Sequence, residues 1–200
     1  MNGRPLEEWT LSERAKSRAV LPQDSSLNFP FTVLEVVLMG RAPHVEAAES
    51  PRDFVIARAA LQQVDALDLE ERIYPTLSGG ERLRVHLASV LAQIWEETGN
   101  PRYLLLDEPT SNLDLTHQHA TLKIAGQFAG DGAAVFVILY DLNLAAQYAD
   151  RILMLKNGRI SAVGVPETVC TPEKIRETFG VSVIEHPHFD CPLIVWRDSV

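Results

Sequence analysis

The sequence has no excess of basic residues and no long apolar run, and each shortage excludes a class of protein. Its 200 residues include 18 Lys and Arg against 27 Asp and Glu, which gives a formal net charge of -9. A protein that binds nucleic acid or an anionic membrane surface needs a basic face, so we expect no nucleic-acid partner. The longest clean apolar run, AAVFVIL, is far shorter than the roughly 18 residues of a membrane span. Any membrane role would therefore require a partner subunit.

Cysteine is scarce as well. The two cysteines, Cys170 and Cys191, form no spacing motif, which favours a reduced cytosolic chain in which both thiols are inert. The composition, 46% hydrophobic and 22% charged, is typical of a compact globular protein, and no internal repeat or low-complexity segment divides the chain. We therefore predict a single domain over residues 1–200.

The six histidines do not form a recognisable metal site. His117 and His119 are two positions apart on a predicted helix, so they point to different faces and cannot share an ion there. His186 and His188 flank a proline in a predicted loop, where we expect solvated side chains rather than ligands. His86 is expected to pack against neighbours or to lie at the surface.

Predicted strands and helices alternate along the chain, which is typical of an α/β fold with a mostly parallel sheet. Thr32 and Glu35 have capping-box spacing, and Thr171, Pro172 and Gly180 mark the two ends of a late helix. We expect strands at residues 18–23, 102–109, 133–140, 181–185 and 192–196, a hairpin at 151–164 around Asn157-Gly158, and helices at 31–40, 53–67, 78–95, 116–129, 141–149 (capped by Asp141) and 171–180. Two of these helices show apolar faces, one through Val55, Ala59 and Val64 and the other through Leu83, Leu87, Val90, Leu91 and Ile94.

The segment LSGGERLRV, Leu77 to Val85, has a serine and two glycines at the start of a predicted helix. Unpaired backbone N–H groups and the helix dipole favour an anion at such a position. The Ser78 hydroxyl would add a donor, and glycines would let a phosphate approach the backbone. An ordinary serine-capped helix after a loop explains the same residues equally well.

The segment LLLDEPTSNLD, Leu104 to Asp114, carries two acids at the end of an apolar strand. Asp107 could bind Mg²⁺ directly or through water, and Glu108 could orient or deprotonate an attacking water. A solvated acidic turn is the alternative. The combination of LSGGE with LLLDEPTSNLD about one helix later is far more specific than either segment alone.

Together these segments resemble the nucleotide-binding subunits of ATP-binding-cassette (ABC) transporters. LSGGE matches the signature motif of that family, with Glu81 in place of the commoner Gln, and YLLLDEP matches its Walker B strand. SNLD resembles the D-loop and VLPQ the Q-loop. The resemblance covers nearly the whole chain. It implies a P-loop NTPase-like ABC ATPase domain with a helical signature region at about residues 30–100.

The resemblance also implies roles for individual residues, with ATP and Mg²⁺ as cofactors. Asp107 would bind Mg²⁺, Glu108 would act on the hydrolytic water, and Gln23 would lie near Mg²⁺ and the transmembrane partner. The residues expected to contact nucleotide are Ser78, Gly79, Gly80, Glu81 and Asp114. Tyr140 stands where the family usually has a His that contacts the γ-phosphate. A phenol with a pKa near 10 is a poor proton relay at neutral pH, and an aromatic packed beneath a loop explains Tyr140 as well.

The phosphate loop of the family is missing. No Gly-x-x-x-x-Gly-Lys-Ser/Thr occurs in these 200 residues. In the family this element lies upstream of the Q-loop, and NGRPL near the start resembles the sequence found after it. We therefore expect a chain that lacks the N-terminal strands and the phosphate loop, is inactive alone, and has uncovered apolar faces on its sheet.

The longer segments LPQDSSLNFPFTVLEVVLMGRAPH and DLNLAAQYADRILMLKNGRI are most similar to the haem (hemin) importer ATPases. Cobalamin and iron-siderophore importer ATPases come next, and no residue resembles a haem ligand. We expect an ABC-type transport ATPase subunit at the cytoplasmic face of the inner membrane. Its partners would be transmembrane permease subunits, a second ATP-binding subunit in a head-to-tail dimer and, indirectly, a substrate-binding protein. One alternative is a catalytically silent or regulatory subunit. The other is a soluble ABC-type ATPase of DNA repair or translation, but the sequence contains no basic patch that would support it.

Overall fold

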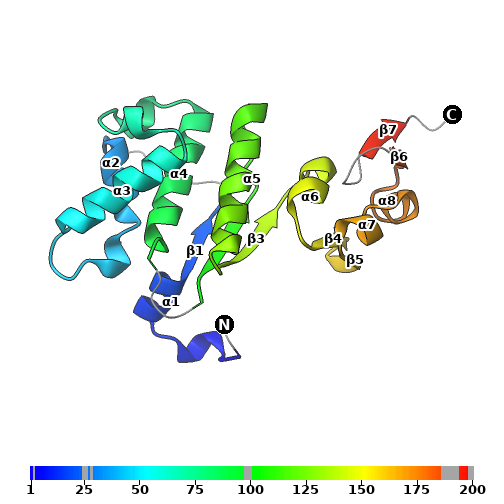
Figure 1. Ribbon diagram of the computed structural model, residues 1–200, viewed down its shortest axis with the longest axis horizontal. Helices are drawn as coiled ribbons and strands as arrows, with labels where there is room; N and C mark the ends of the chain where they lie inside the picture. The colour runs from blue at the N-terminus through cyan, green and yellow to red at the C-terminus, as the bar shows by residue number, and fades with distance from the viewer. Residues whose placement is uncertain (2, 24–26, 28, 97–100, 186–193, 198–200) are drawn as a thin grey trace. The chain divides into compact units, whose positions relative to one another are not determined.

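The computed structural model describes residues 1, 3–23, 27, 29–96, 101–185 and 194–197, and it divides into two compact units, Met1–Ile138 and Leu139–Val200 (Figure 1). The single domain over residues 1–200 stays a prediction. His186, His188 and Cys191 lie outside the described residues, and Cys170 is buried. Within the described ranges, no helix has the length and apolar character needed to cross a membrane.

The first unit alternates helices and strands as predicted. Short 3-10 turns connect the helices between β1 and β2. In chain order the elements are the 3-10 helix η1 (Leu6–Glu8), α1 (Leu11–Ser17), β1 (Arg18–Leu21), α2 (Val33–Met39), η2 (Ala42–His44), α3 (Pro51–Gln63), η3 (Leu67–Leu69), η4 (Tyr74–Thr76), α4 (Gly79–Gln93), β2 (Tyr103–Asp107), α5 (Leu115–Gly130) and β3 (Ala134–Ile138).

The strands of this unit form a parallel sheet in the order β1-β2-β3, which confirms the predicted α/β architecture (Figure 1). Leu21 is aligned with Leu106, and Asp107 is aligned with Ile138. Because all strands run in the same direction, the residues that follow them meet at one edge of the sheet. Gln23 lies two residues beyond Leu21, and Glu108 lies two residues beyond Leu106. The register therefore predicts that Gln23 and Glu108 are neighbours.

The sheet has one covered face and one open face. Leu104 and Leu106 belong to the main hydrophobic core, where α4 packs on β1 and α5 packs on β3. Successive side chains of a strand point to opposite faces, so Val20, Phe136 and Ile138 share the other face. These three side chains are 44%, 54% and 42% exposed. The expected uncovered apolar face is therefore present.

Capping boxes begin the first four α-helices of this unit. The backbone N–H of Thr32 donates to Glu35 at 2.7 Å, and the N–H of Glu35 donates back to the Thr32 hydroxyl at 3.2 Å. These reciprocal bonds satisfy backbone donors that have no partner within the helix. The predicted start of α2 is confirmed, and the same arrangement begins α1, α3 and α4.

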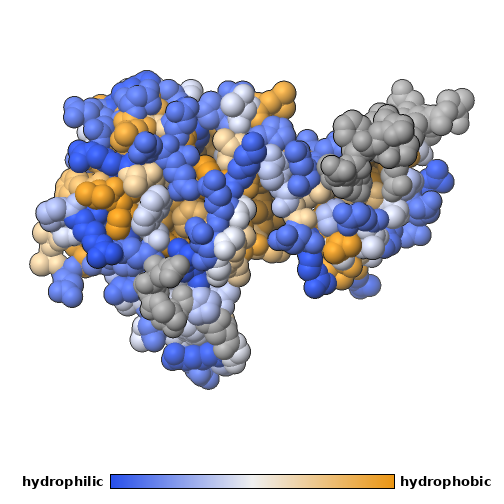
Figure 2. All heavy atoms as spheres, viewed as in Figure 1, coloured by the Kyte–Doolittle hydropathy of each residue, from blue (hydrophilic) through white to orange (hydrophobic). Residues whose placement is uncertain are grey.

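The predicted apolar face of α3 is wrong at Val55, whose side chain is 67% exposed. A helix turns by about 100° per residue, so the row through residues 55 and 59 lies beside the row that faces α2 and α4. Figure 2 shows a hydrophobic patch within a largely hydrophilic surface over α3. The residues of α3 that are buried instead are Asp53, Ile56, Ala57, Ala60 and Leu61.

The second unit has its own small core around Met154 and Ile175. Its predicted hairpin is confirmed: Asn157 and Gly158 have φ of 51° and 74°, the left-handed values that a two-residue type I′ turn requires. In chain order the elements are α6 (Leu142–Tyr148), β4 (Ile152–Lys156), β5 (Arg159–Gly164), α7 (Pro166–Val169), α8 (Pro172–Phe179), β6 (Ser182–Glu185) and β7 (Ile194–Arg197). The strands pair antiparallel, β4 with β5 and β6 with β7.

Candidate functional site

An open pocket of about 490 Å³ lies where the start of α4 meets the loop before α5. We call it the signature pocket. It joins the two segments that the sequence singled out, because both LSGGE and SNLD contribute to its wall. Its lining residues are Ser78, Gly79, Gly80, Glu81, Arg84, Asn112, Leu113, Asp114 and His117.

Ser78 caps α4 and leaves donors directed at the pocket. Its hydroxyl oxygen accepts from the N–H of Glu81 at 3.3 Å, and the Glu81 carboxylate accepts from the N–H of Ser78 at 2.7 Å. The first intrahelical bond runs from the N–H of Arg82 to the carbonyl oxygen of Ser78. The N–H groups of Gly79 and Gly80 therefore precede the helical ladder, where backbone donors point out of the helix end.

Glu81 is ionised and paired. The backbone N–H of Ser78, its hydroxyl and the nearby Arg72 guanidinium hold the pKa of Glu81 below its ordinary value. Arg72 Nη1 lies 3.1 Å from Glu81 Oε1. The carboxylate that replaces the commoner Gln is thus partly neutralised by Arg72.

Gly80 is required by close packing. A Cβ on Gly80 would lie 2.9 Å from the carbonyl oxygen of Asn112, a backbone atom, whereas a Cβ on Gly79 would meet only the Asn112 side chain at 3.8 Å. Asn112 itself has φ 59°, in the left-handed region that Asn tolerates. The second glycine therefore lets the loop before α5 approach α4, which is a different role from the approach of a phosphate.

We expect Gly80→Ala to destabilise the first unit by about 1–3 kcal/mol, the usual cost of forcing extra volume into a packed contact. Gly79→Ala is the matched control, since 3.8 Å is an ordinary van der Waals distance and alanine favours a helix. The measurement is the denaturant midpoint of each variant. Equal midpoints for the two variants would contradict the assignment of close packing to Gly80.

Asp114 and His117 fix the other wall of the pocket. The Asp114 carboxylate caps α5 by accepting from the backbone N–H of His117 at 2.9 Å, and it also accepts from the His117 ring at 2.9 Å. The backbone bond, followed by the ring bond, lowers the pKa of Asp114. On its other side, His117 Nε2 lies 3.7 Å from a carboxylate oxygen of Asp65.

Four lining residues were not among the predicted nucleotide contacts: Arg84, Asn112, Leu113 and His117. Arg84 lies four residues after Gly80, which puts both on one side of α4, and this spacing could have revealed it. His117 is three residues after a capping Asp, a position whose side chain lies beside the cap. No sequence signal pointed to the backbone of Asn112. The His117 ring is hydrogen-bonded to Asp114, and His86 packs against Tyr74 as expected.

The second cluster lies at the carboxyl edge of the sheet. Gln23 Nε2 donates to Glu108 Oε1 at 2.8 Å, which brings together the two residues that the register aligns. Glu108 has φ 51°, a conformation that costs a non-glycine residue roughly 1–3 kcal/mol and that often marks a functional site. Asp107 ends β2 beside it and is half-buried.

The residues of this edge fit Mg²⁺ better than they fit a metal ion whose ligands are all protein side chains. Among the residues that the structure describes, no group of three or more His, Cys, Asp or Glu could hold a metal ion. Mg²⁺ is typically bound by one or two carboxylates together with substrate phosphates and water. Asp107 would supply one such carboxylate, and the amide oxygen of Gln23, which follows the neighbouring strand β1, could supply a further oxygen.

Tyr140 belongs to the second unit, directly before the α6 cap Asp141, whose carboxylate accepts from Asn143 and Leu144 as predicted. Its side chain is 81% exposed. The alternative that Tyr140 is an aromatic packed beneath a loop is therefore wrong.

The sequence profile of ABC transporters matches residues 1–111, which contain the α4 side of the signature pocket but not its four lining residues from Asn112 onward. The chain belongs to the ABC transporter family. This membership accounts for the parallel sheet, for the signature pocket and for the acidic pair that follows β2.

Curated relatives match almost the full length of this ABC chain. The hemin import ATP-binding protein of Gloeobacter violaceus is 58% identical over 198 residues, which are 98% of this chain and 72% of that protein. The hemin import ATP-binding protein of Deinococcus radiodurans is 51% identical over 195 residues, 96% of this chain and 74% of that protein.

Solved structures show the same fold. A metal-chelate type ABC transporter in an inward-facing conformation aligns with a TM-score of 0.78 at 27% identity, over 91% of this chain and 73% of that one. A dimeric ATP-binding cassette in a post-hydrolysis state, bound to ADP and phosphate, aligns with a TM-score of 0.68 at 26% identity. That alignment covers 82% of this chain and 68% of the cassette.

Proposed function

We propose that this ABC chain is the ATP-binding subunit of an importer, and that its signature pocket contacts a nucleotide held by a second ATP-binding subunit. The observation that carries the proposal is the meeting of the open helix end of α4 with the Asn112–Asp114 loop in one pocket. ATP hydrolysis coupled to import is the reaction we assign to the assembled transporter, and the dimeric cassette bound to ADP and phosphate supports it by its similarity.

The chemistry of the pocket suits a terminal phosphate. The Ser78 hydroxyl hydrogen faces the Glu81 carboxylate in the structure, and its rotation would direct it to a phosphate oxygen instead. The N–H groups of Gly79 and Gly80 and the dipole of α4 add to this donor, and charge-assisted bonds of this type are strong. Asp114 does not contact phosphate in this proposal, since its carboxylate holds the loop.

The residues at the sheet edge would serve this chain's own nucleotide. Asp107 and Gln23 would hold Mg²⁺ through oxygen atoms, and Mg²⁺ would neutralise charge on the phosphates. Glu108 would orient the attacking water, and Tyr140 stands at the position from which the family usually contacts the γ-phosphate. The bond from Gln23 to Glu108 brings two of these groups within reach of one water molecule.

Haem is the substrate we propose, since the hemin import proteins of two distant bacteria match nearly the entire chain. The chain itself would not touch haem. Iron-siderophore complexes and cobalamin are the alternative substrates. The partners are transmembrane permease subunits, with a substrate-binding protein acting indirectly, and the location is the cytoplasmic face of the inner membrane.

The proposal is tested by mixing the chain with the full-length hemin import ATP-binding protein of Gloeobacter violaceus. We expect ATP to drive formation of a mixed dimer, measured by sedimentation or by energy transfer between labelled chains. ADP is the control, since it lacks the γ-phosphate that would reach Ser78. Association that is equal with ATP, with ADP and without nucleotide would refute the proposed role of the pocket.

We expect the 200-residue chain alone to hydrolyse ATP no faster than background. No Gly-x-x-x-x-Gly-Lys-Ser/Thr occurs in its sequence, and the amides and Lys of that loop grip the β- and γ-phosphates in P-loop enzymes. The measurement is phosphate release with Mg²⁺ and ATP. Turnover that Glu108→Gln abolishes would show that this expectation is wrong.

A second candidate function is a catalytically silent subunit that contributes only its signature pocket. Reading the genomic sequence upstream of the Met1 codon separates the two candidates. An in-frame Gly-rich loop that ends in Gly-Lys-Ser or Gly-Lys-Thr supports a hydrolytic subunit, whereas an in-frame stop codon supports the silent one.

A further inference from the structure

Gly40 brings the end of α2 into backbone contact with α4. A Cβ on Gly40 would lie 2.9 Å from the Ser89 hydroxyl oxygen and closer still to the Ser89 carbonyl oxygen. Gly40 has φ −62°, a value that every residue adopts, so space and not backbone conformation requires the glycine. The two helices thus touch at a point where no side chain fits.

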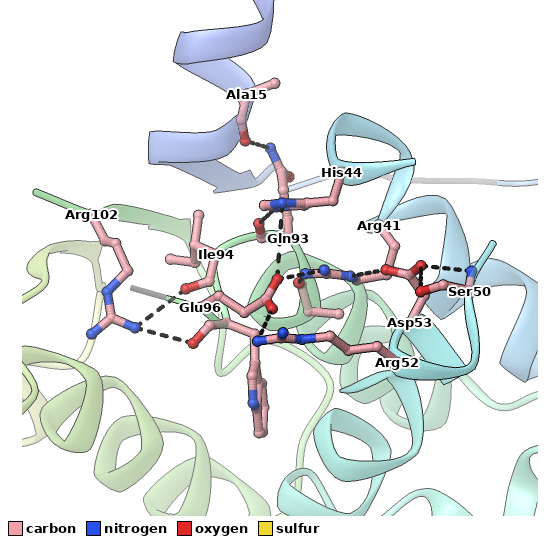
Figure 3. Close-up of polar contacts among 12 residues, drawn as sticks. Ala15, Arg41, His44, Ser50, Arg52, Asp53, Gln93, Ile94, Glu96 and Arg102 are labelled. Atoms are coloured by element: carbon pink, nitrogen blue, oxygen red, sulfur yellow. Dashed lines mark hydrogen bonds and ion pairs between the residues drawn. The ribbon is translucent and has the colours of Figure 1, made fainter. Parts of the chain in front are cut away.

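The next residue, Arg41, is 2% exposed, and its three guanidinium nitrogens bind α3, α4 and Glu96 in the segment after α4 (Figure 3). Nη1 donates to the carbonyl oxygen of Ala92 at 2.7 Å, Nε to Asp53 at 2.9 Å and Nη2 to Glu96 at 2.6 Å. A buried charge is costly unless it is paired and hydrogen-bonded, and here every nitrogen has an acceptor. Hydrogen bonds from Ser50, and then from Arg41, lower the pKa of Asp53 to about 2, so this acceptor stays ionised.

Other side chains fasten the same end of α4. The His44 ring donates from Nε2 to the carbonyl oxygen of Gln93 at 2.8 Å. The Gln93 side chain donates to the carbonyl oxygens of Ala15 at 2.7 Å and Arg18 at 3.1 Å, where α1 leads into β1. The last carbonyls of a helix have no partner within it, so these bonds attach the end of α4 to α1, β1 and the turn after α2.

α4 has 15 residues and is about 22 Å long, and its other end forms the signature pocket. We propose that Gly40 and Arg41 are positioning residues of that pocket: they lock the end of α2 to the end of α4, so that the first turn of α4 moves with α2. The importance of the pocket rests on the proposed function, but the lock is a property of this chain alone.

The chain offers a matched pair of arginines for the test, since Arg41 and Arg52 bind the same carboxylate, Glu96. The Arg52 side chain is 75% exposed and pairs with Glu96 at the surface, whereas Arg41 is buried and also binds the carbonyl oxygen of Ala92. Arg41→Met and Arg52→Met remove equal charge and leave the same side chain. Only Arg41→Met releases the end of the helix.

The first measurement is amide hydrogen exchange of the 200-residue chain in the cold, without nucleotide. For Arg41→Met we expect the amides of Glu81, Arg82 and His117 at the pocket to exchange about tenfold faster relative to amides in the middle of α5. Arg52→Met should leave this ratio unchanged. If Arg41 has a merely structural role, Arg41→Met raises the exchange rates of all slow amides together, or only the rates of amides within one turn of Ala92. Either pattern would overturn the proposal.

The second measurement uses the mixed dimer. Arg41→Met should raise the ATP concentration for half-maximal association about tenfold, while the maximal extent of association of the folded chain is kept. If Arg41→Met does not fold, Arg41→Lys replaces it, because an ammonium group cannot span Ala92, Asp53 and Glu96 at once. An unchanged half-maximal ATP concentration in the substituted chain contradicts the lock. Failure of the unsubstituted chain to associate refutes the proposed function instead, and the exchange ratio still decides the inference.

Discussion

Ser78→Arg in this chain is expected to abolish ATP-driven association with a full-length partner subunit. Ser78 lies exposed at the lip of the signature pocket, and its hydroxyl is the side-chain donor aimed at the partner's nucleotide. An arginine there would fill the space that the γ-phosphate enters. Loss of the helix cap alone costs only about 1 kcal/mol, roughly a fivefold effect, so complete loss of association requires obstruction of the nucleotide.

Ser78→Thr is the matched control, because threonine keeps both the cap and the hydroxyl. Glu108→Gln in this chain should leave the ATPase rate of the mixed dimer almost unchanged, because the partner's own carboxylate orients the attacking water at the partner's nucleotide. The measurement is phosphate release by a defined heterodimer that carries each substitution in this chain only. If Glu108→Gln stops turnover while Ser78→Arg does not, the two sites are assigned to the wrong subunits.

Local features of the fold were predictable because their signals lie within a few residues. The capping box of Thr32 and Glu35, the positive φ values of Asn157 and Gly158, and the left-handed cap at Gly180 each follow from one residue type at one spacing. The parallel sheet followed from alternation of strands and helices.

Contacts between segments distant in the chain were not predictable in the same way. Gly40 has no unusual backbone conformation, and only the packing of Ser89 against it shows why it is a glycine. Arg41 looks like a surface arginine in the sequence, yet it is buried because Asp53 and Glu96 converge on it from two other elements. Such convergence depends on how α2, α3 and α4 pack and not on any local pattern.

The candidate site also combines features that follow from local sequence with features that depend on how distant segments pack. The motifs identified Ser78, Asp107, Glu108 and Asp114 by residue type and spacing. The bond between Gln23 and Glu108 follows only once the register of β1 on β2 is known. The role of Gly80 in packing against Asn112 needed coordinates, since a phosphate site and a close backbone contact both favour glycine.

The isolated chain is expected to be weakly stable and to self-associate. Val20, Phe136 and Ile138 expose apolar surface on one face of a sheet whose end strands are β1 and β3 among the described residues. A few hundred Å² of such surface at about 25 cal/mol/Å² corresponds to roughly 5–10 kcal/mol, comparable to the whole stability of a domain. Open strand edges add sites for pairing with other chains. A monomeric, cooperative melt above roughly 45 °C would contradict this expectation.

Substitution of that face separates self-association from poor folding. Phe136→Thr should reduce light scattering at a given concentration and leave the denaturant midpoint nearly unchanged, because the ring is 54% exposed and threonine suits a strand. Val137→Thr is the control: its side chain packs against the core on the opposite face, so it should lower the free energy of unfolding by about 1–3 kcal/mol, and the midpoint with it, without reducing scattering. If Phe136→Thr lowers the midpoint as much as Val137→Thr does, the face that carries Phe136 is covered in solution and the weak stability of the chain has another cause.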